Sequence, residues 1–326
     1  MTYIRTLVPV FALCAGLTVA TVAMAQEAAP APEAATTLED VVVTARRSGA
    51  PMWEVTRGEG TVLLVGEIRG VPAATPWRPD ALEAATLRAD RVFSGMRVQA
   101  SFSDLLRLIW RSRTLASLPE GKTSADYLTP EWQARLSALE ARYGQDYSRR
   151  SFLMSSGDLL TDRLRFNRNT TDDAGDVVKR AARRGRIKVE AVEAGRGDAL
   201  IENLLTAPPE SLVPCLQAAI VATEAGPDSL IARGEAWTKF QAPAVLASPL
   251  EHALSVCWPW GDPSLGPQLK AEWVKAVNTG LNETGVTMAV APFNVLAERG
   301  GVLDQLEAQG LEIEGPIWRE DQRQLQ

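Results

Sequence analysis

The stretch Thr61-Val-Leu-Leu-Val-Gly-Glu-Ile-Arg-Gly70 decides how the rest of the chain is interpreted. Four consecutive apolar residues followed by Gly66 are typical of a buried strand that approaches its C-terminal end. In open α/β sheets, ligands bind just beyond the C-terminal ends of the strands. Glu67 and Arg69 stand at this place. We therefore predict that this strand end lines the functional cleft.

The patterns on either side of this stretch predict an α/β domain with a central, mostly parallel sheet. The expected strands cover residues 51–55, 61–68, 91–94, 187–193, 287–291 and 311–314. The first two form a hairpin, and each end of the domain reads as strand, helix, strand, which is the pattern of a parallel crossover. Residues 101–166 and 199–247 favour helices, whereas residues 248–267 read as irregular. The prediction is a sheet built from two β-α-β ends with a large helical insertion.

The composition suits a globular protein and disfavours some classes of function. The chain has 326 residues, of which 46% are hydrophobic and 23% charged, enough for a sizeable core. A formal charge of −6 argues against a nucleic-acid partner, whose binding sites are basic. His252 is the single histidine of the chain, so mechanisms that need a histidine pair are disfavoured.

The N-terminal residues 1–25 have the pattern of a secretory signal peptide. Arg5 precedes an apolar run that ends in Ala23-Met24-Ala25, a small-residue cleavage signal. The alternative is an uncleaved membrane anchor, because the run approaches the length of a membrane span. We expect cleavage, a periplasmic or secreted protein, and no membrane span in the remaining chain.

Residues 26–50 are expected to form a disordered linker, and residues 319–326 a polar tail, around a folded domain at 51–318. The linker contains the β-prone segment from Leu38 to Arg47. Its Val41–Arg47 part is similar to the N-terminal segment of TonB-dependent receptors, where an extended strand adds to a partner's sheet. A plain β-prone linker without a partner is the alternative.

Two cysteines remain after the expected cleavage, Cys215 and Cys257. In an oxidising compartment they are candidates for a disulfide, and two separate buried thiols are the alternative.

Several short motifs follow one another in order after Pro51. They are Pro51-Met52-Trp53, Leu64-Val65-Gly66, Ala89–Val92, Ala125–Glu131, Asp176 before an Arg-rich helix, Val192-Glu193, Ala236-Trp237 and Gly301–Gly310. This order resembles the TraB/GumN (pheromone-shutdown) proteins, which are related to the Tiki proteases. The resemblance implies an α/β fold and metal-dependent peptide hydrolysis, with histidine and glutamate as metal ligands or base. Such ligands suit zinc or manganese, which lower the pKa of a bound water.

The chain departs from that pattern at the positions that carry the implied chemistry. Arg69 and Asn294 stand where the family has histidines, and an acid expected after the second strand falls on Ser94 or Gly95. Glu193 is the matching acid that remains. The resemblance therefore implies a divergent member that lacks the motif histidines.

Three functional readings follow. The first is a non-catalytic member of the family that binds a peptide or an envelope protein and needs no cofactor. The second is a periplasmic hydrolase or peptidase that is metal-dependent or uses Glu67 and Glu193 as a carboxylate pair at neighbouring strand ends, with Arg69 holding an anionic group. The structural alternative to this second reading is that Glu67 and Arg69 only neutralise each other on one face of the strand or pair with Glu193. In the third reading, the protein is a partner of outer-membrane machinery through Val41–Arg47. Arg69, Ser94 and Asn294 are expected to line the cleft in each case.

Overall fold

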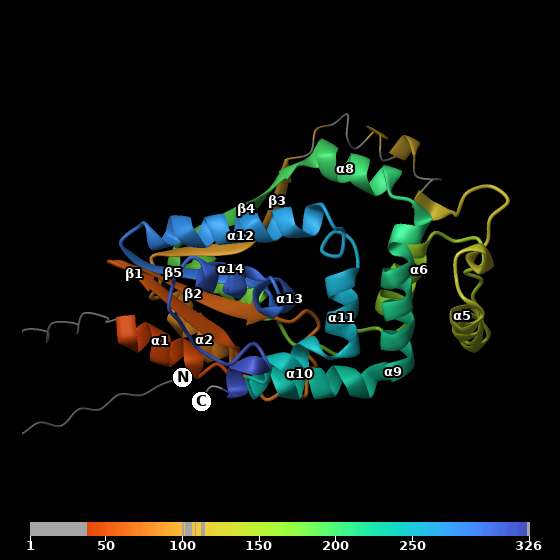
Figure 1. The fold of residues 1–326 in the computed structure, drawn as a ribbon. Helices are drawn as coiled ribbons and strands as arrows, with labels where there is room; N and C mark the ends of the chain where they lie inside the picture. The colour runs from red at the N-terminus through yellow and green to blue at the C-terminus, as the bar shows by residue number, and fades with distance from the viewer. Residues whose placement is uncertain (1–37, 100, 102–105, 108, 112–114, 325–326) are drawn as a thin grey trace, which may run out of the picture. The chain divides into compact units, whose positions relative to one another are not determined.

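Strand β2 (Gly60–Glu67) lies inside a six-stranded sheet and is buried along nearly all of its length. The strand order is β4-β3-β5-β2-β1-β6 (Figure 1). The other strands are β1 (Met52–Arg57), β3 (Arg91–Gln99), β4 (Lys188–Arg196), β5 (Gly285–Pro292) and β6 (Ile313–Glu314). Strands β4, β3, β5 and β2 are parallel neighbours, and β1 pairs antiparallel with both β2 and β6. The predicted hairpin and the mostly parallel α/β sheet are confirmed.

The computed structural model describes residues 38–99, 101, 106–107, 109–111 and 115–324. The predicted signal peptide and residues 26–37 of the predicted linker lie outside this range.

The helices follow the sheet in three groups. Before β3 come α1 (Leu38–Arg46) and α2 (Pro79–Thr86). Between β3 and β4 come η1 (Ser124–Asp126), α5 (Pro130–Tyr143), α6 (Phe152–Asp158), the π-helical η2 (Leu159–Arg163) and α7 (Ala174–Gly185). After β4 come α8 (Gly197–Thr206), η3 (Pro209–Leu212), α9 (Val213–Thr238), α10 (Ala242–Leu246), α11 (Pro249–Val256), α12 (Leu265–Leu281), α13 (Phe293–Ala297), α14 (Val302–Ala308) and η4 (Asp321–Gln324).

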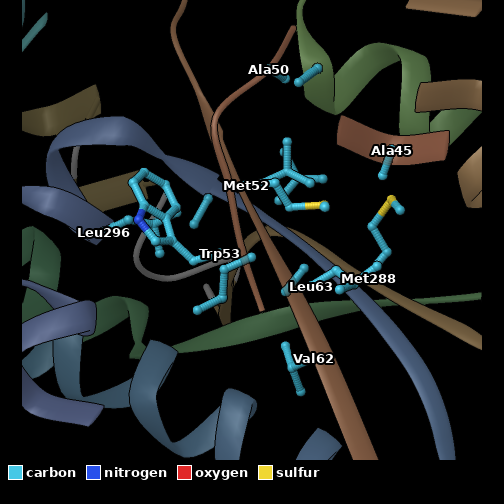
Figure 2. Close-up of a cluster of buried hydrophobic side chains, with 14 of the residues drawn as sticks. Ala45, Ala50, Met52, Trp53, Val62, Leu63, Met288 and Leu296 are labelled. Carbon is cyan, nitrogen blue, oxygen red and sulfur yellow. The ribbon is translucent and has the colours of Figure 1, made fainter. Parts of the chain in front are cut away.

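Two hydrophobic cores hold these elements together. The first surrounds the sheet, and its members include Val62, Leu63, Met288 and Leu296 of α13 (Figure 2). The second lies within the helical insertion and joins α5, α6 and η2 to α9 and α11. Apolar area removed from water supplies the main stabilising term in both, at about 25 cal/mol per Å². The cleft described below is lined by elements of both cores.

The prediction of an extended, β-prone segment at residues 38–47 is wrong, because residues 38–46 form helix α1. Val41, Val42 and Ala45 are buried, a helical spacing, whereas Val43 is 43% exposed. Packing of this face against α2 and the sheet core outweighs the strand preference of the three valines. With these side chains buried in a helix, the segment does not present the free strand that a TonB-type contact requires.

A further expectation needs correction. Residues 249–256 of the segment expected to be irregular form helix α11, which begins with Ser248 as N-cap and Pro249 in the first turn. In the segment predicted to be a polar tail, Arg319 donates to Asp304 Oδ1 at 3.2 Å and to Glu307 Oε2 at 2.7 Å.

Candidate functional site

The strand ends that were predicted to form a cleft lie next to each other in the sheet. Glu67 at the end of β2 pairs in register with Pro292 at the end of β5, and Asn294 follows two residues later. The next strand, β3, pairs Ser94 with Val290 of β5. Because β5 lies between β2 and β3, the C-terminal ends of three parallel strands meet on one side of the sheet. This is the place where open α/β sheets bind their ligands.

A cleft of about 490 Å³ lies at these strand ends. Its polar lining side chains include Glu67, Arg69, Lys179 and Asn294, and its apolar lining is rich in tryptophan and proline. The aromatic and proline residues of the lining are Trp258, Pro259, Trp260, Trp273 and Pro292. A cavity of this kind, mostly apolar with a few converging polar groups, is the usual form of a small-ligand or peptide site.

Glu67 is partly buried at the N-terminal end of α7. Its Oε2 accepts a hydrogen bond from the Gly175 N–H at 3.0 Å. Burial, and second the nearby carboxylate of Asp173, raise the pKa of Glu67 to about 7, although Lys179 and Arg69 act in the opposite direction. Burial also raises the pKa of Asp173, which caps α7 by accepting from the Asp176 N–H at 2.9 Å. Near neutral pH, Glu67 is therefore divided between its neutral and charged forms.

The two cations of the cleft have no carboxylate within ion-pair distance among the described residues. Arg69 is exposed at the end of β2, and Lys179 of α7 is partly buried. Glu67, which is half-neutral at pH 7, and Asp173 both interact electrostatically with these cations without forming an ion pair with them. Arg69 and Lys179 are therefore available to pair with an anionic ligand.

A buried ion pair supports the backbone beneath Arg69. Arg233 of α9 donates from Nη1 to Glu251 Oε1 of α11 at 2.7 Å, and both side chains are almost completely buried. Nη2 of Arg233 donates to the carbonyl oxygens of Arg69 and Gly70. Trp237, one turn further along α9, donates from Nε1 to the Gly66 carbonyl at 2.8 Å. These contacts position the strand end from which Arg69 projects.

Two buried side-chain N–H groups of residues at the cleft have no acceptor among the described residues. They are Nδ2 of Asn294, whose side chain is almost fully buried, and Nε1 of Trp273. Leaving a buried donor unpaired costs on the order of 1–3 kcal/mol. Both atoms are shielded from solvent, so a ligand in the cleft does not contact them in this arrangement of side chains.

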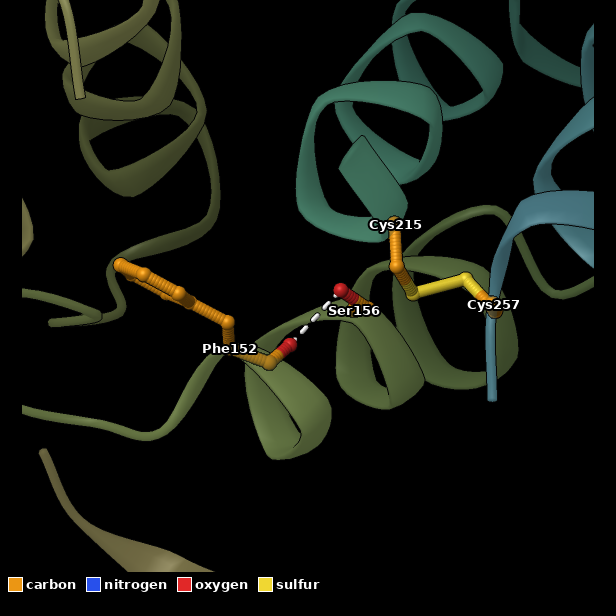
Figure 3. The surroundings of a disulfide bond; sticks show 4 residues. All are labelled: Phe152, Ser156, Cys215 and Cys257. Carbon is orange, nitrogen blue, oxygen red and sulfur yellow. Dashed lines mark hydrogen bonds between the residues drawn. A yellow bond between two sulfur atoms is a disulfide. The ribbon is translucent and has the colours of Figure 1, made fainter. Parts of the chain in front are cut away.

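The Trp258–Trp260 wall of the cleft is tied to the helical insertion by a disulfide between Cys215 of α9 and Cys257 (Figure 3). Of the two alternatives, a disulfide or two separate buried thiols, the structure contains the disulfide. Trp258 donates from Nε1 to Asn203 Oδ1 at 3.0 Å, which holds its ring against α8. In the same region Ser156 of α6 donates to the Phe152 carbonyl at 2.7 Å.

The structure does not bring together all the residues expected at the site. Glu193 lies on β4, three strands from β2, so about 14 Å of sheet separate the two strands at the usual spacing. Glu193 instead pairs with Arg97 and Gln99 of β3, contacts that lower its pKa. The expected carboxylate pair of neighbouring strands is therefore wrong. Ser94 is buried in the sheet, where it does not line the cleft.

Sequence reasoning missed other residues of the site. Lys179 lay within a basic helix whose charges read as solvated surface, and Trp273 lay within an ordinary amphipathic helix. The sequence around Lys179 and around Trp273 contains no motif that identifies either residue as part of a site. The tryptophans around Pro259 could have been found, because two tryptophans flanking a proline beside a cysteine are unusual in an exposed loop.

The side chains at the strand ends do not fit the metal site that the resemblance implies. The guanidinium of Arg69 cannot act as a ligand, and the side chain of Asn294 is almost fully buried. Glu67 already accepts from a backbone N–H, and Glu193 lies three strands away. The donor set that remains favours an anion over a divalent cation.

No single helix of the described residues has the length and apolar character of a membrane span, while α8 with residues Pro209–Thr238 passes as a pair bent by 102°.

Comparison with known proteins gives one match. The sequence profile of the TraB/PrgY/gumN family matches residues 51–315, which confirms the resemblance drawn from the short motifs. No curated protein and no solved structure matches the chain.

Proposed function

The chain belongs to the TraB/PrgY/gumN family, and we propose that it is a non-catalytic member, exported to the periplasm, that binds a peptide or a segment of an envelope protein in the cleft. The observation that carries this proposal is the donor set of the cleft. Two cations without an ion-pair partner among the described residues, Arg69 and Lys179, line a space that has two carboxylates, the half-neutral Glu67 and Glu251, which is already paired with Arg233.

The chemistry of the lining indicates the kind of group that binds. Guanidinium and ammonium groups both pair with carboxylate oxygens, and Arg69 can hold a carboxylate through two parallel hydrogen bonds. Trp258, Trp260 and Trp273 supply apolar contact area beside these donors. A peptide that ends in an aromatic residue with a free carboxylate carries both features.

Two features support export. The N-terminal 25 residues have the signal-peptide pattern, and the Cys215–Cys257 disulfide belongs to an oxidising compartment.

The alternative is a carboxylate-based hydrolase, and the raised pKa of Glu67 favours it. A carboxylate with a pKa of about 7 is suited to general-base catalysis at neutral pH. Its partner would be Asp173 at the same helix end, in place of Glu193. Arg69 and Lys179 favour binding over this alternative, because cations without an ion-pair partner among the described residues can hold an anionic ligand.

Binding is tested with acetyl-Ala-Ala-Phe carrying a free C-terminus and with its C-terminal amide. We expect the free acid to change tryptophan fluorescence and to bind at least tenfold tighter than the amide. Arg69→Gln should remove that preference, since a hydrogen bond to a charged group contributes about 1.5–3 kcal/mol. Arg57→Gln is the matched control, because Arg57 lies at the opposite end of β2, beside Gly60. Equal binding of acid and amide would refute the proposal.

Mass spectrometry of the same peptide after prolonged incubation separates binding from hydrolysis. An intact peptide is expected for the binding protein. Cleavage that Glu67→Gln abolishes would establish the hydrolase instead. Tightly bound stoichiometric metal, accompanied by peptidase activity that a chelator removes, would overturn both the binding proposal and the carboxylate-based alternative.

A further inference from the structure

A second cavity, here called the arginine pocket, lies away from the cleft in the helical insertion. It has a volume of about 580 Å³ and is bounded by the end of α5, by η2 with the loop that follows it, and by α9 at Gly226-Pro227. Four arginines line it: Arg142, Arg163, Arg165 and Arg168. Asp162 is the one acid of the lining, although the whole chain carries a net charge of −6.

One of these arginines is already used inside the protein. Arg163 donates to both oxygens of the buried Asp158, at 2.9 and 3.3 Å. Arg150 and the hydroxyl of Tyr147 complete the surroundings of this carboxylate. Because the charge of Asp158 is already paired with Arg163 and Arg150, it does not neutralise the other arginines of the pocket.

The other three arginines have no carboxylate within ion-pair distance among the residues that the structure describes. Arg142 stacks over the ring of Tyr143, with its guanidinium carbon 5.3 Å from the ring centre. Arg165 donates from Nε to the Asp162 carbonyl at 3.2 Å. Like charges gathered around one cavity raise the local potential, which attracts an anionic ligand.

The loop that carries Arg165 and Arg168 has a strained backbone. Arg165 and Asn169 both adopt left-handed backbone, with φ of 56° and 54°. For residues other than glycine such a conformation is uncommon and costly, and it is often found at functional sites. The same loop is fixed to the cleft strand at Gly70, where an added Cβ would lie 2.2 Å from the Phe166 carbonyl oxygen.

A third hollow of about 500 Å³ shares Phe166 and Thr170 with the arginine pocket and shares Arg69 with the cleft. Its lining also contains Asp172, Asp173 and Asp176, which would repel an acidic ligand. An acidic ligand is therefore expected in the arginine pocket itself. The pocket also has apolar walls, including Tyr143, Leu230 and Ile231, which suit a peptide better than a fully hydrated polyanion.

From this cluster we propose that the arginine pocket is a second binding site, which takes the acidic side chains of an extended peptide. Arg142, Arg165 and Arg168 pair with its carboxylates, and Arg163 remains paired with Asp158. This site differs from the cleft in the group that it binds. The cleft is proposed to bind a C-terminal carboxylate, whereas the arginine pocket binds side-chain carboxylates.

The test uses a probe that lacks a terminal carboxylate. Acetyl-hexaglutamate amide is titrated into the full chain by calorimetry at low salt, with acetyl-hexaglutamine amide for comparison. We expect the glutamate peptide to bind at least tenfold tighter and its affinity to fall as salt is raised. Arg142→Gln/Arg168→Gln should reduce its affinity at least tenfold. Arg57→Gln/Arg88→Gln, the same charge change at the other end of the sheet, should leave it within twofold.

Equal affinity of the two hexapeptides, or an equal loss in both double variants, would overturn the proposal. Tighter binding of inorganic polyphosphate than of hexaglutamate, lost in Arg142→Gln/Arg168→Gln, would also overturn it, by assigning the pocket to another class of anion. Binding of acetyl-Ala-Ala-Phe reports on the cleft alone. A failure of the cleft proposal is therefore distinguishable from a failure of this one.

Discussion

Replacing Glu67 by glutamine tests the electrostatics of the cleft without changing its shape. Glutamine keeps an oxygen that accepts the Gly175 N–H, but it cannot ionise. In the unfolded chain Glu67 ionises near pH 4.5, and in the folded protein its pKa is about 7. Between these values the folded state binds more protons, so the free energy of unfolding falls as the pH rises.

The size of the effect follows from this difference. A pKa raised from 4.5 to about 7 corresponds to about 3 kcal/mol of unfolding free energy, which is lost between those two pH values. Below pH 4.5 the wild type and Glu67→Gln should have similar stabilities. Above pH 7.5 the variant should be more stable by up to about 3 kcal/mol, which is roughly 6 °C in melting temperature for a domain of this size.

The assay is urea unfolding of both proteins at half-unit steps from pH 4 to pH 8. Glu193→Gln is the matched control, because Arg97 and Gln99 lower the pKa of that exposed carboxylate. Its contribution is present above pH 4.5 and is lost as the pH falls, so its small effect should have the opposite sign. A stability difference between wild type and Glu67→Gln that stays constant across the pH range would refute the burial of an ionisable Glu67.

Other predictions concern the cleft and its supports. Acetyl-Ala-Ala-Phe should bind more weakly as the pH rises through about 7, because ionised Glu67 repels its carboxylate, and this dependence should be absent from fluorescence titrations of Glu67→Gln. Gly175→Ala places a Cβ 2.4 Å from Glu67 Oε2 and should cost about 1–3 kcal/mol in urea unfolding, whereas Gly157→Ala, with nothing within 4 Å, should change stability by less than about 1 kcal/mol. Arg233→Met leaves Glu251 buried without its partner and should cost about 3–5 kcal/mol, most of which Arg233→Met/Glu251→Leu should restore; an additive loss in the double variant would contradict the ion pair. Cys215→Ala/Cys257→Ala opens a loop of 42 residues and should lower the free energy of unfolding by about 4 kcal/mol under oxidising conditions, with no difference from the reduced wild type.

Much of the fold could be predicted from local patterns. The apolar run before Gly66 is long enough and rich enough in Val and Leu to identify a buried strand, and β2 is that strand. The ends of α5 carry local signals of the same kind, since Thr129 is its N-cap, Pro130 lies in its first turn and Gly144 is its C-cap. The position of the site beyond β2 followed from the same local signal.

Local patterns failed where a distant contact outweighs them. Residues 38–46 carry three consecutive valines, yet they form a helix because α2 and the sheet core cover one helical face. The buried Arg233–Glu251 pair gives no signal in the sequence, since each partner alone reads as a surface charge.

The sequence by itself determined the strands, the helical character of the insertion and the location of Glu67 and Arg69 at a strand end. Only the tertiary structure decided which side chains share the cleft. The strand order determines which side chains these are, because β5, which is distant in the chain, lies between β2 and β3. Asn294 and Trp273 therefore line the cleft, while Glu193 lies three strands from β2. Hydrogen bonding between strands is carried by backbone groups that every residue has, so the order of a sheet leaves little trace in any one stretch of sequence. The chemistry of this cleft therefore depends on pairings between distant segments, and the predicted Glu67–Glu193 pair failed for that reason.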